Sequence, residues 1–124
     1  MMTTQEVANR YYQLARQGQL EKIQDELYAP DAVSIEPEND SQLPLEVAGL
    51  PAMRQKERQF YQLIEQMHGG FCNEPVVSSY YFACTMGMDV TMKGKARRVK
   101  EQLGVFEVDK GKIVKEQFFY NDFD

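Results

Sequence analysis

The residue best suited to chemistry in this sequence is Glu36, a carboxylate placed directly before Pro37. The proline favours extended backbone at Glu36 and disfavours helix. A short strand is predicted at Val33–Ile35, so the acid lies at its end, where the mouth of a small cavity would form. A carboxylate there would exchange a proton with a bound molecule. A second interpretation stays open, in which Glu36 begins a solvated acidic loop with Glu38 and Asp40.

Other reactive groups are few. His68 is the only histidine of the sequence and is expected at the C-terminal end of a helix, where the helix dipole favours an imidazolium. Alternatively, it is a second acid–base group that faces Glu36. Cys72 and Cys84 lack metal-ligand spacing and are predicted to be free, buried thiols. One histidine and scattered carboxylates form no compact ligand set, so neither a metal nor a cofactor is expected.

Helices must position these groups. The first helix is predicted to begin with a capping box formed by Thr3 and Glu6, and the second to stop at Pro30. A third helix begins at Gly49, with a proline in its first turn, and Gly69-Gly70 is predicted to end it. The residues of its buried face follow helical spacing. They are Met53, Phe60, Leu63, Ile64 and Met67.

The second half of the sequence changes to a period of two residues. This alternation predicts long strands at Phe82–Met92 and Ala96–Val108, and a further strand at Lys112–Tyr120. Asp109-Lys110-Gly111 is predicted to form a hairpin turn. Three helices followed by a mostly antiparallel meander predict one α+β domain over residues 1–124, with helices on one face of a curved sheet.

Composition excludes several classes of function. A net charge of -5 argues against binding to a nucleic-acid backbone, which requires clustered basic residues. The basic run Lys93–Lys100 is either a solvated hairpin connection or a rim for an anionic ligand. The N-terminus shows no pattern of a secretory signal, and the apolar stretches are too short to cross a membrane. A cytoplasmic protein is therefore expected.

Five short motifs have a familiar order and spacing: Asn9-Arg10-Tyr11-Tyr12, Gly18-Gln19-Leu20-Glu21, Leu27-Tyr28-Ala29-Pro30-Asp31-Ala32-Val33, Gly49-Leu50-Pro51-Ala52-Met53 and Gly111-Lys112-Ile113-Val114. Together they resemble the SnoaL-like branch of the nuclear transport factor 2-like superfamily and, more distantly, ketosteroid isomerase. The resemblance covers about residues 4 to 120. It implies a cone-shaped α+β fold with a deep, mostly apolar pocket between helices and sheet, and a homodimer formed through the sheet.

The resemblance also suggests roles. Glu36 falls where ketosteroid isomerase carries its aspartate general base, and Tyr11 falls where that enzyme carries its oxyanion-hole tyrosine. Tyr11 lies on the apolar stripe of its helix, so a buried core tyrosine is the other interpretation. Tyr12 is about 100° further around the helix and is the alternative pocket tyrosine.

One position of the isomerase site has no counterpart. Its second hydrogen-bond donor, an aspartic acid, corresponds to Leu103 or Gly104, and neither side chain can donate. Glu101 or Gln102 would substitute as a ligand-binding residue. Glu101 alternates with apolar side chains, an unusual place for a charge, so pairing with a basic neighbour or with an adjacent strand is equally open.

The resulting expectation is a protein that binds a small, largely apolar molecule, with Phe60 and Phe118 among the residues that contact it. If the protein is catalytic, it would be a cofactor-independent isomerase or cyclase that transfers a proton next to a carbonyl. Glu36 would be the base, and Tyr11 with His68 would complete the catalytic set. The alternative is a non-catalytic module for ligand binding or dimeric association.

Overall fold

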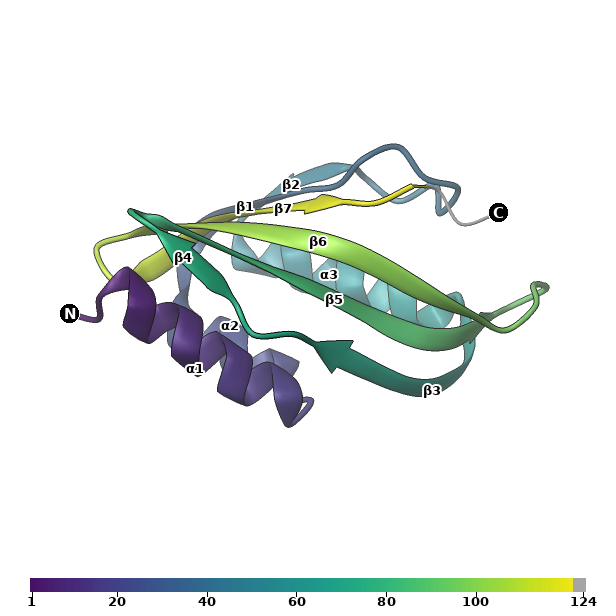
Figure 1. The fold of residues 1–124 in the computed structure, drawn as a ribbon. Helices are drawn as coiled ribbons and strands as arrows, with labels where there is room; N and C mark the ends of the chain where they lie inside the picture. The colour runs from purple at the N-terminus through teal and green to yellow at the C-terminus, as the bar shows by residue number, and fades with distance from the viewer. Residues whose placement is uncertain (122–124) are drawn as a thin grey trace.

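The computed structural model describes residues 1–121, which form three helices and one seven-stranded sheet (Figure 1). This confirms the expected α+β class. The helices are α1 (Thr4–Arg16), α2 (Leu20–Leu27) and α3 (Leu50–Gln62). The strands are β1 (Tyr28–Ile35), β2 (Glu46–Ala48), β3 (Ile64–Cys72), β4 (Val76–Ser78), β5 (Tyr81–Met92), β6 (Arg98–Asp109) and β7 (Lys112–Phe119).

The sheet brings the two ends of the fold together. Its strand order is β2-β1-β7-β6-β5-β3, and β4 pairs with β5 beside this path. All pairs are antiparallel except β1 with β7, which is parallel. In that pair Ser34 lies opposite Glu116. The first strand and the last strand therefore contribute side chains to one place.

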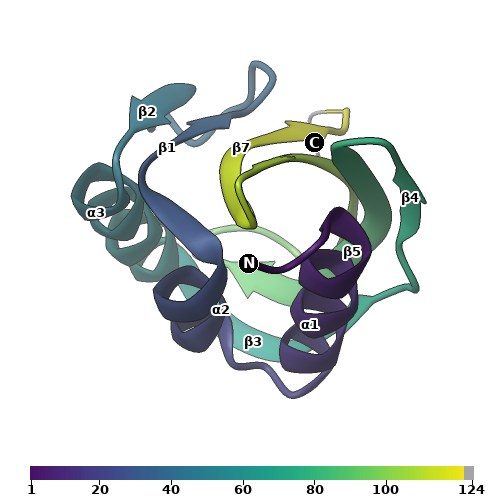
Figure 2. The same cartoon turned by 90° about the vertical axis from the view of Figure 1, so that its left-hand side faces the viewer.

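The helices cover one face of the curved sheet (Figure 2). Helix α3 contacts β1, β2 and β3, whereas α1 contacts α2, β3, β4 and β5. We call the covered face the inner face and the opposite one the outer face. Buried residues of the inner face include Phe82, Cys84, Phe106 and Glu116. Exposed residues of the outer face include Tyr81, Val99, Leu103 and Phe119.

Local signals in the sequence locate several boundaries correctly. The capping box is present: Thr3 accepts a hydrogen bond from the backbone of Glu6, and the Glu6 carboxylate accepts one from the backbone of Thr3. The predicted turn between β6 and β7 is also confirmed. Lys110 and Gly111 both have positive φ, which two-residue hairpin turns of type I′ require.

The start of β1 differs from the prediction. The strand begins at Tyr28 rather than Val33, and α2 ends at Leu27, before Pro30 is reached. The pairing of β1 with β7 shifts register between Tyr28 and Val33. Proline is tolerated in a strand at such an irregularity, because it removes no hydrogen bond from the ladder there.

The prediction of a third helix extending to Gly69-Gly70 is wrong. Helix α3 ends at Gln62, and both glycines lie within β3. Leu63, Ile64 and Met67 continue the helical spacing, but β3 pairs with β5 from Ile64 to Cys72, with two register shifts along the way. Tertiary pairing therefore outweighs a local pattern that fits either structure. The short strands β2 and β4 also had no prediction, and β6 begins at Arg98 rather than Ala96.

In the part of the chain that the structure describes, no helix is long and apolar enough to cross a membrane.

Candidate functional site

Glu36 lies directly after β1 and forms an ion pair with α3. Its Oε2 atom is 2.8 Å from Nζ of Lys56. The Lys56 side chain is 11% exposed and the Glu36 side chain 25%, so the pair is largely shielded from water. The backbone N–H of Glu36 donates to the carbonyl of Leu45, which fixes the extended conformation expected before a proline. A carboxylate and an ammonium thus meet where α3 covers the sheet.

A second carboxyl group, Glu116, is buried deeper on the inner face. The hydroxyl groups of Tyr28 and Ser34 both donate hydrogen bonds to it, the latter over 2.7 Å. Burial raises the pKa of Glu116 to about 7, with further contributions from the negative charges of Glu57 and Glu36. Glu116 therefore holds its proton well above the pH at which an exposed glutamate loses it.

The two carboxyl groups occupy neighbouring rows of the same face. Ser34 and Glu36 are two residues apart, so the Cα atoms of these two residues are separated by about 7 Å. Alternate residues of a strand share a face, so both side chains lie on the same side. Glu116 is opposite Ser34 in the parallel pair. Lys56, Glu116, Tyr28 and Ser34 were not among the predicted site residues, and the contact between Glu116 and Ser34 spans 82 residues of sequence.

Tyr11 is a core residue on the inner side. Its ring contacts Phe106 at 4.7 Å and Phe82 at 5.6 Å, between ring centroids. Its hydroxyl oxygen lies 4.0 Å from Sδ of Met86. Burial, followed by the negative charge of Glu116, raises the pKa of Tyr11 well above its usual value. Tyr11 therefore stays protonated and able to donate a hydrogen bond.

Tyr12 lies elsewhere on α1. Its ring stacks with the guanidinium group of Arg16, whose central carbon is 5.2 Å from the ring centroid. Tyr12 is half-buried, and this cation–π contact lies within α1.

Three other predicted residues lie near the inner face or on α3. Gln102 is half-buried and opposite Met86, on the inner side of β6. Phe118 packs against the buried core, with its ring centroid 6.2 Å from that of Phe106. Phe60 is half-buried on α3 and contacts Tyr61 edge to face.

His68 is not at the end of a helix, as predicted, but in β3. Its Nε2 atom is 2.8 Å from Oγ1 of Thr91. Thr91 alternates with buried Val90 in β5, so this contact lies on the outer face. His68 therefore lies on the opposite face of the sheet from Glu36. The predicted position was wrong because α3 ends at Gln62, before His68 is reached.

Glu101 is exposed and also lies on the outer face, between Val99 and Leu103. Arg97 is a basic neighbour of Glu101 in the sequence, but it forms a bidentate ion pair with Asp89 and not with Glu101. The structure thus separates Glu101 from the inner-face carboxyl groups.

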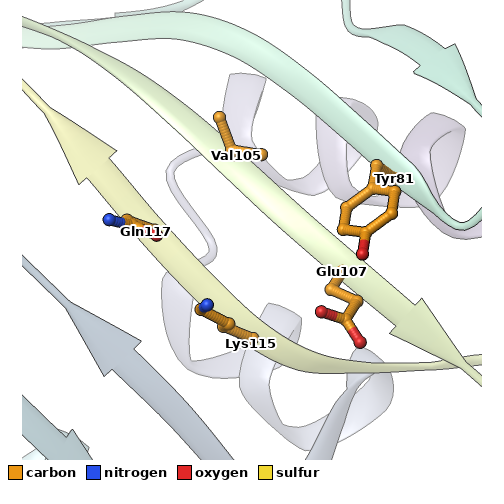
Figure 3. Close-up of a pocket in the computed structure, with 5 residues that line it drawn as sticks. All are labelled: Tyr81, Val105, Glu107, Lys115 and Gln117. Carbon is orange, nitrogen blue, oxygen red and sulfur yellow. The ribbon is translucent and has the colours of Figure 1, made fainter.

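The outer face carries an open hollow of its own (Figure 3). Its lining residues come from three neighbouring strands and are Tyr81, Val105, Glu107, Lys115 and Gln117. None of the predicted site residues lines this hollow. Among residues 1–121 there is also no cluster of histidine, cysteine and acidic side chains that would hold a metal ion.

The family model of the SnoaL-like domain matches residues 2–120. The chain therefore belongs to the SnoaL-like family. Among curated proteins there is no match.

Solved structures share the fold over nearly the whole chain. A candidate SnoaL-like polyketide cyclase from Mesorhizobium loti, also described as a carbohydrate phosphatase, is 31% identical, with 96% of this chain and 100% of that chain covered and a TM-score of 0.85. A nuclear transport factor 2-like protein from Burkholderia thailandensis is 13% identical, with 98% and 92% covered and a TM-score of 0.79. A cystatin-like protein of unknown function from Xanthomonas campestris is 16% identical, with 95% and 90% covered and a TM-score of 0.78. The last two likenesses establish the fold.

Proposed function

We propose that this SnoaL-like protein binds a small, largely apolar carbonyl compound against the inner face and transfers a proton at the carbon next to the carbonyl, without a cofactor. The observation that carries the proposal is the shielded Glu36–Lys56 pair beside a second carboxyl group, Glu116, whose pKa burial raises to about 7. The likeness to a candidate polyketide cyclase supports an isomerisation or cyclisation of this kind.

Glu36 is the group proposed to take the proton. Lys56 holds this carboxylate in place and adds a positive charge where negative charge would develop on the carbonyl oxygen. Because Glu36 retains partial exposure, a ligand that displaces water would reach its free oxygen. Removing water from the pair would strengthen these electrostatic interactions.

Glu116 is proposed to supply the neutral acid that the resemblance to ketosteroid isomerase lacks at Leu103 and Gly104. A carboxyl group kept neutral near pH 7 can donate a hydrogen bond to a developing oxyanion. Glu116 lies in β7. This strand pairs with β6, which contains Leu103 and Gly104, the positions that correspond to the missing donor. Tyr11, whose charge environment includes Glu116, remains a second proposed donor.

One observation favours a non-catalytic binding protein instead. Both oxygens of Glu116 already accept hydrogen bonds, and Glu36 already has a cationic partner. Carboxyl groups whose hydrogen bonds and ion pairs are already made are also expected in a purely structural network. In this alternative the inner face holds its ligand without turnover.

Deuterium exchange separates the two functions. The protein in deuterium oxide is mixed with β-tetralone, a bicyclic ketone with acidic protons next to the carbonyl, and proton NMR follows both binding and exchange. General base catalysis contributes about 10²–10⁴-fold, so we expect exchange well above the buffer rate. Line broadening of the ketone signals without faster exchange would instead support the binding protein.

We further propose a homodimer formed through the outer face. Five large apolar side chains are exposed on it: Phe71, Tyr81, Val99, Leu103 and Phe119. Leu103 and Phe119 are directly opposite each other in the ladder, so the apolar area is continuous there. Exposed apolar patches of this kind mark association surfaces, and a second copy offers the same patch by symmetry.

Light scattering after gel filtration tests the dimer. We expect wild-type protein at micromolar concentration to have twice the chain mass and Leu103→Asp to have the mass of one chain. Tyr61→Asp is the matched control, because Tyr61 is as exposed but lies on α3. A wild-type protein of single-chain mass would contradict the proposal.

A further inference from the structure

Cys72 and Cys84 form a close thiol pair that the proposed function does not use. Their sulfur atoms are 3.9 Å apart, and the structure contains both as free cysteines. Cys84 is buried on the inner face of β5, whereas Cys72 is half-buried at the last position of β3. One thiol is thus accessible to a small reagent, and its neighbour is protected behind it.

The two thiols differ in chemistry as well as in exposure. The hydrogen bond between the two thiols lowers the pKa of the Cys72 thiol. The same contact, together with burial, raises the pKa of the Cys84 thiol. Since the thiolate is the reactive form of cysteine, Cys72 is the sulfur that reacts first.

We propose that Cys72 and Cys84 are a redox-sensitive pair, which a hydroperoxide converts into a reversible intramolecular disulfide between β3 and β5. The proposal is independent of any activity at Glu36. It rests on the position of the two sulfurs and on their unequal exposure.

The reaction proceeds in two balanced steps. In the first, the Cys72 thiolate attacks one oxygen of hydrogen peroxide, the O–O bond breaks, and hydroxide leaves with a proton as water; Cys72 becomes a sulfenic acid. In the second, the Cys84 thiol loses its proton and its sulfur attacks the Cys72 sulfur, so the S–O bond breaks and a second water leaves. The thiols are oxidised and the peroxide is reduced.

Forming the disulfide requires the two sulfurs to move closer together, with a small shift of the backbone. A disulfide needs an S–S distance of about 2.05 Å, compared with the 3.9 Å observed. Cys72 pairs with Met86 in the ladder, and Cys84 comes two residues before Met86 in β5, which makes it a diagonal neighbour of Cys72. The β3 strand ends at Cys72, but Asn73 still donates hydrogen bonds to Thr85 of β5 from its backbone and its side chain. The sulfurs therefore approach at the end of β3 while the two strands stay paired.

Mass spectrometry on the purified, reduced protein tests the proposal. After a small excess of hydrogen peroxide, the protein is denatured in iodoacetamide and digested with chymotrypsin, which cleaves after aromatic residues such as Tyr80 and Phe82. We expect a pair of peptides joined through Cys72 and Cys84, with two hydrogen atoms lost per chain and no alkylation. Dithiothreitol should separate them and restore both alkylation sites.

Two serine variants test the order of events. In Cys84→Ser, the first step remains and dimedone should label Cys72 as a sulfenic acid. In Cys72→Ser, labelling of Cys84 should be at least about 10-fold slower, because Cys84 is buried and burial both hinders the reagent and disfavours the thiolate. Wild-type protein that keeps both thiols after peroxide, or that loses them only in disulfides between chains on a non-reducing gel, would overturn the proposal. This wild-type result does not depend on the variants folding.

Discussion

The two faces of β6 show how one strand serves two environments. Phe106 on the inner face is completely buried and stacks on Phe82, with ring centroids 4.6 Å apart. Leu103, three positions away, lies on the outer face and is 39% exposed. Both are large apolar residues, so side-chain type alone does not distinguish them. The difference is in what packs on each face. Three helices pack on the inner face, whereas among the described residues nothing covers Leu103 on the outer face.

The same contrast applies to charged groups. Glu116 and Glu101 are both strand glutamates with apolar residues two positions away on each side, Val114 and Phe118 for the first and Val99 and Leu103 for the second. Glu116 faces inward, where burial raises its pKa to about 7 and two hydroxyl groups hold it. Glu101 faces outward and is exposed. A carboxyl group acquires unusual acid–base behaviour from its surroundings, which makes the inner face the place to expect chemistry.

The largest predicted effect is on packing. Phe106→Ala should lower the free energy of unfolding by about 3–5 kcal/mol, because it leaves a cavity beside Phe82 and Tyr11. In the single chain, where Leu103 is exposed, Leu103→Ala should cost about 1 kcal/mol or less. Urea unfolding by circular dichroism, at a protein concentration that does not alter the wild-type curve, gives both values. Equal costs would show that the outer face is covered as completely as the inner one.

The next effect is a pH dependence from Glu116. Its pKa is 4.5 in an unstructured chain and about 7 in the folded protein. Between these values the unfolded chain has released the proton that the folded one keeps, so stability falls as pH rises through this window. The shift corresponds to about 3 kcal/mol. Glu116→Gln should lack this fall when unfolding is measured from pH 4 to pH 8.

Glu101→Gln is the control for that experiment, and its pH profile should follow the wild-type profile. A Glu116→Gln profile identical to wild type would contradict a raised pKa of the buried Glu116 carboxyl group.

A smaller effect concerns ion pairs. Lys56→Met should destabilise the protein by about 1–2 kcal/mol, because it leaves the partly buried Glu36 carboxylate without its partner. This loss lies between those of surface and buried ion pairs. Arg97→Met removes the exposed pair with Asp89 on the outer face and should cause no measurable change. Thermal unfolding of both variants at low salt compares them. A larger loss from Arg97→Met would reverse the ranking of the two faces.

The sequence predicts most of the fold because many of its signals are local. The capping box at Thr3 and the turn at Lys110-Gly111 depend only on neighbouring residues. The strand β3 could not be predicted in this way. The spacing of Leu63, Ile64 and Met67 suits a helix, and only pairing with β5, more than twenty residues later, makes it a strand.

The candidate site was predicted less completely for the same reason. Glu36 was found from its position before a proline, which is a local feature. Lys56 resembles any exposed helical lysine in sequence, and Glu116 resembles a solvated strand residue. Their roles depend on contacts with β1, far away in the chain. The one available signal for Glu116 was its place two residues before Phe118, on the same strand face.

Exchange of the protons next to the carbonyl of β-tetralone, compared between Glu36→Gln and Glu101→Gln, tests whether Glu36 transfers the proton. Both variants remove one carboxylate and keep its shape, one beside Lys56 and the other on the outer face. We predict that Glu36→Gln lowers the NMR exchange rate by about 10²-fold or more, while Glu101→Gln keeps the wild-type rate. Equal rates in the two variants would contradict a proton-transfer role for Glu36.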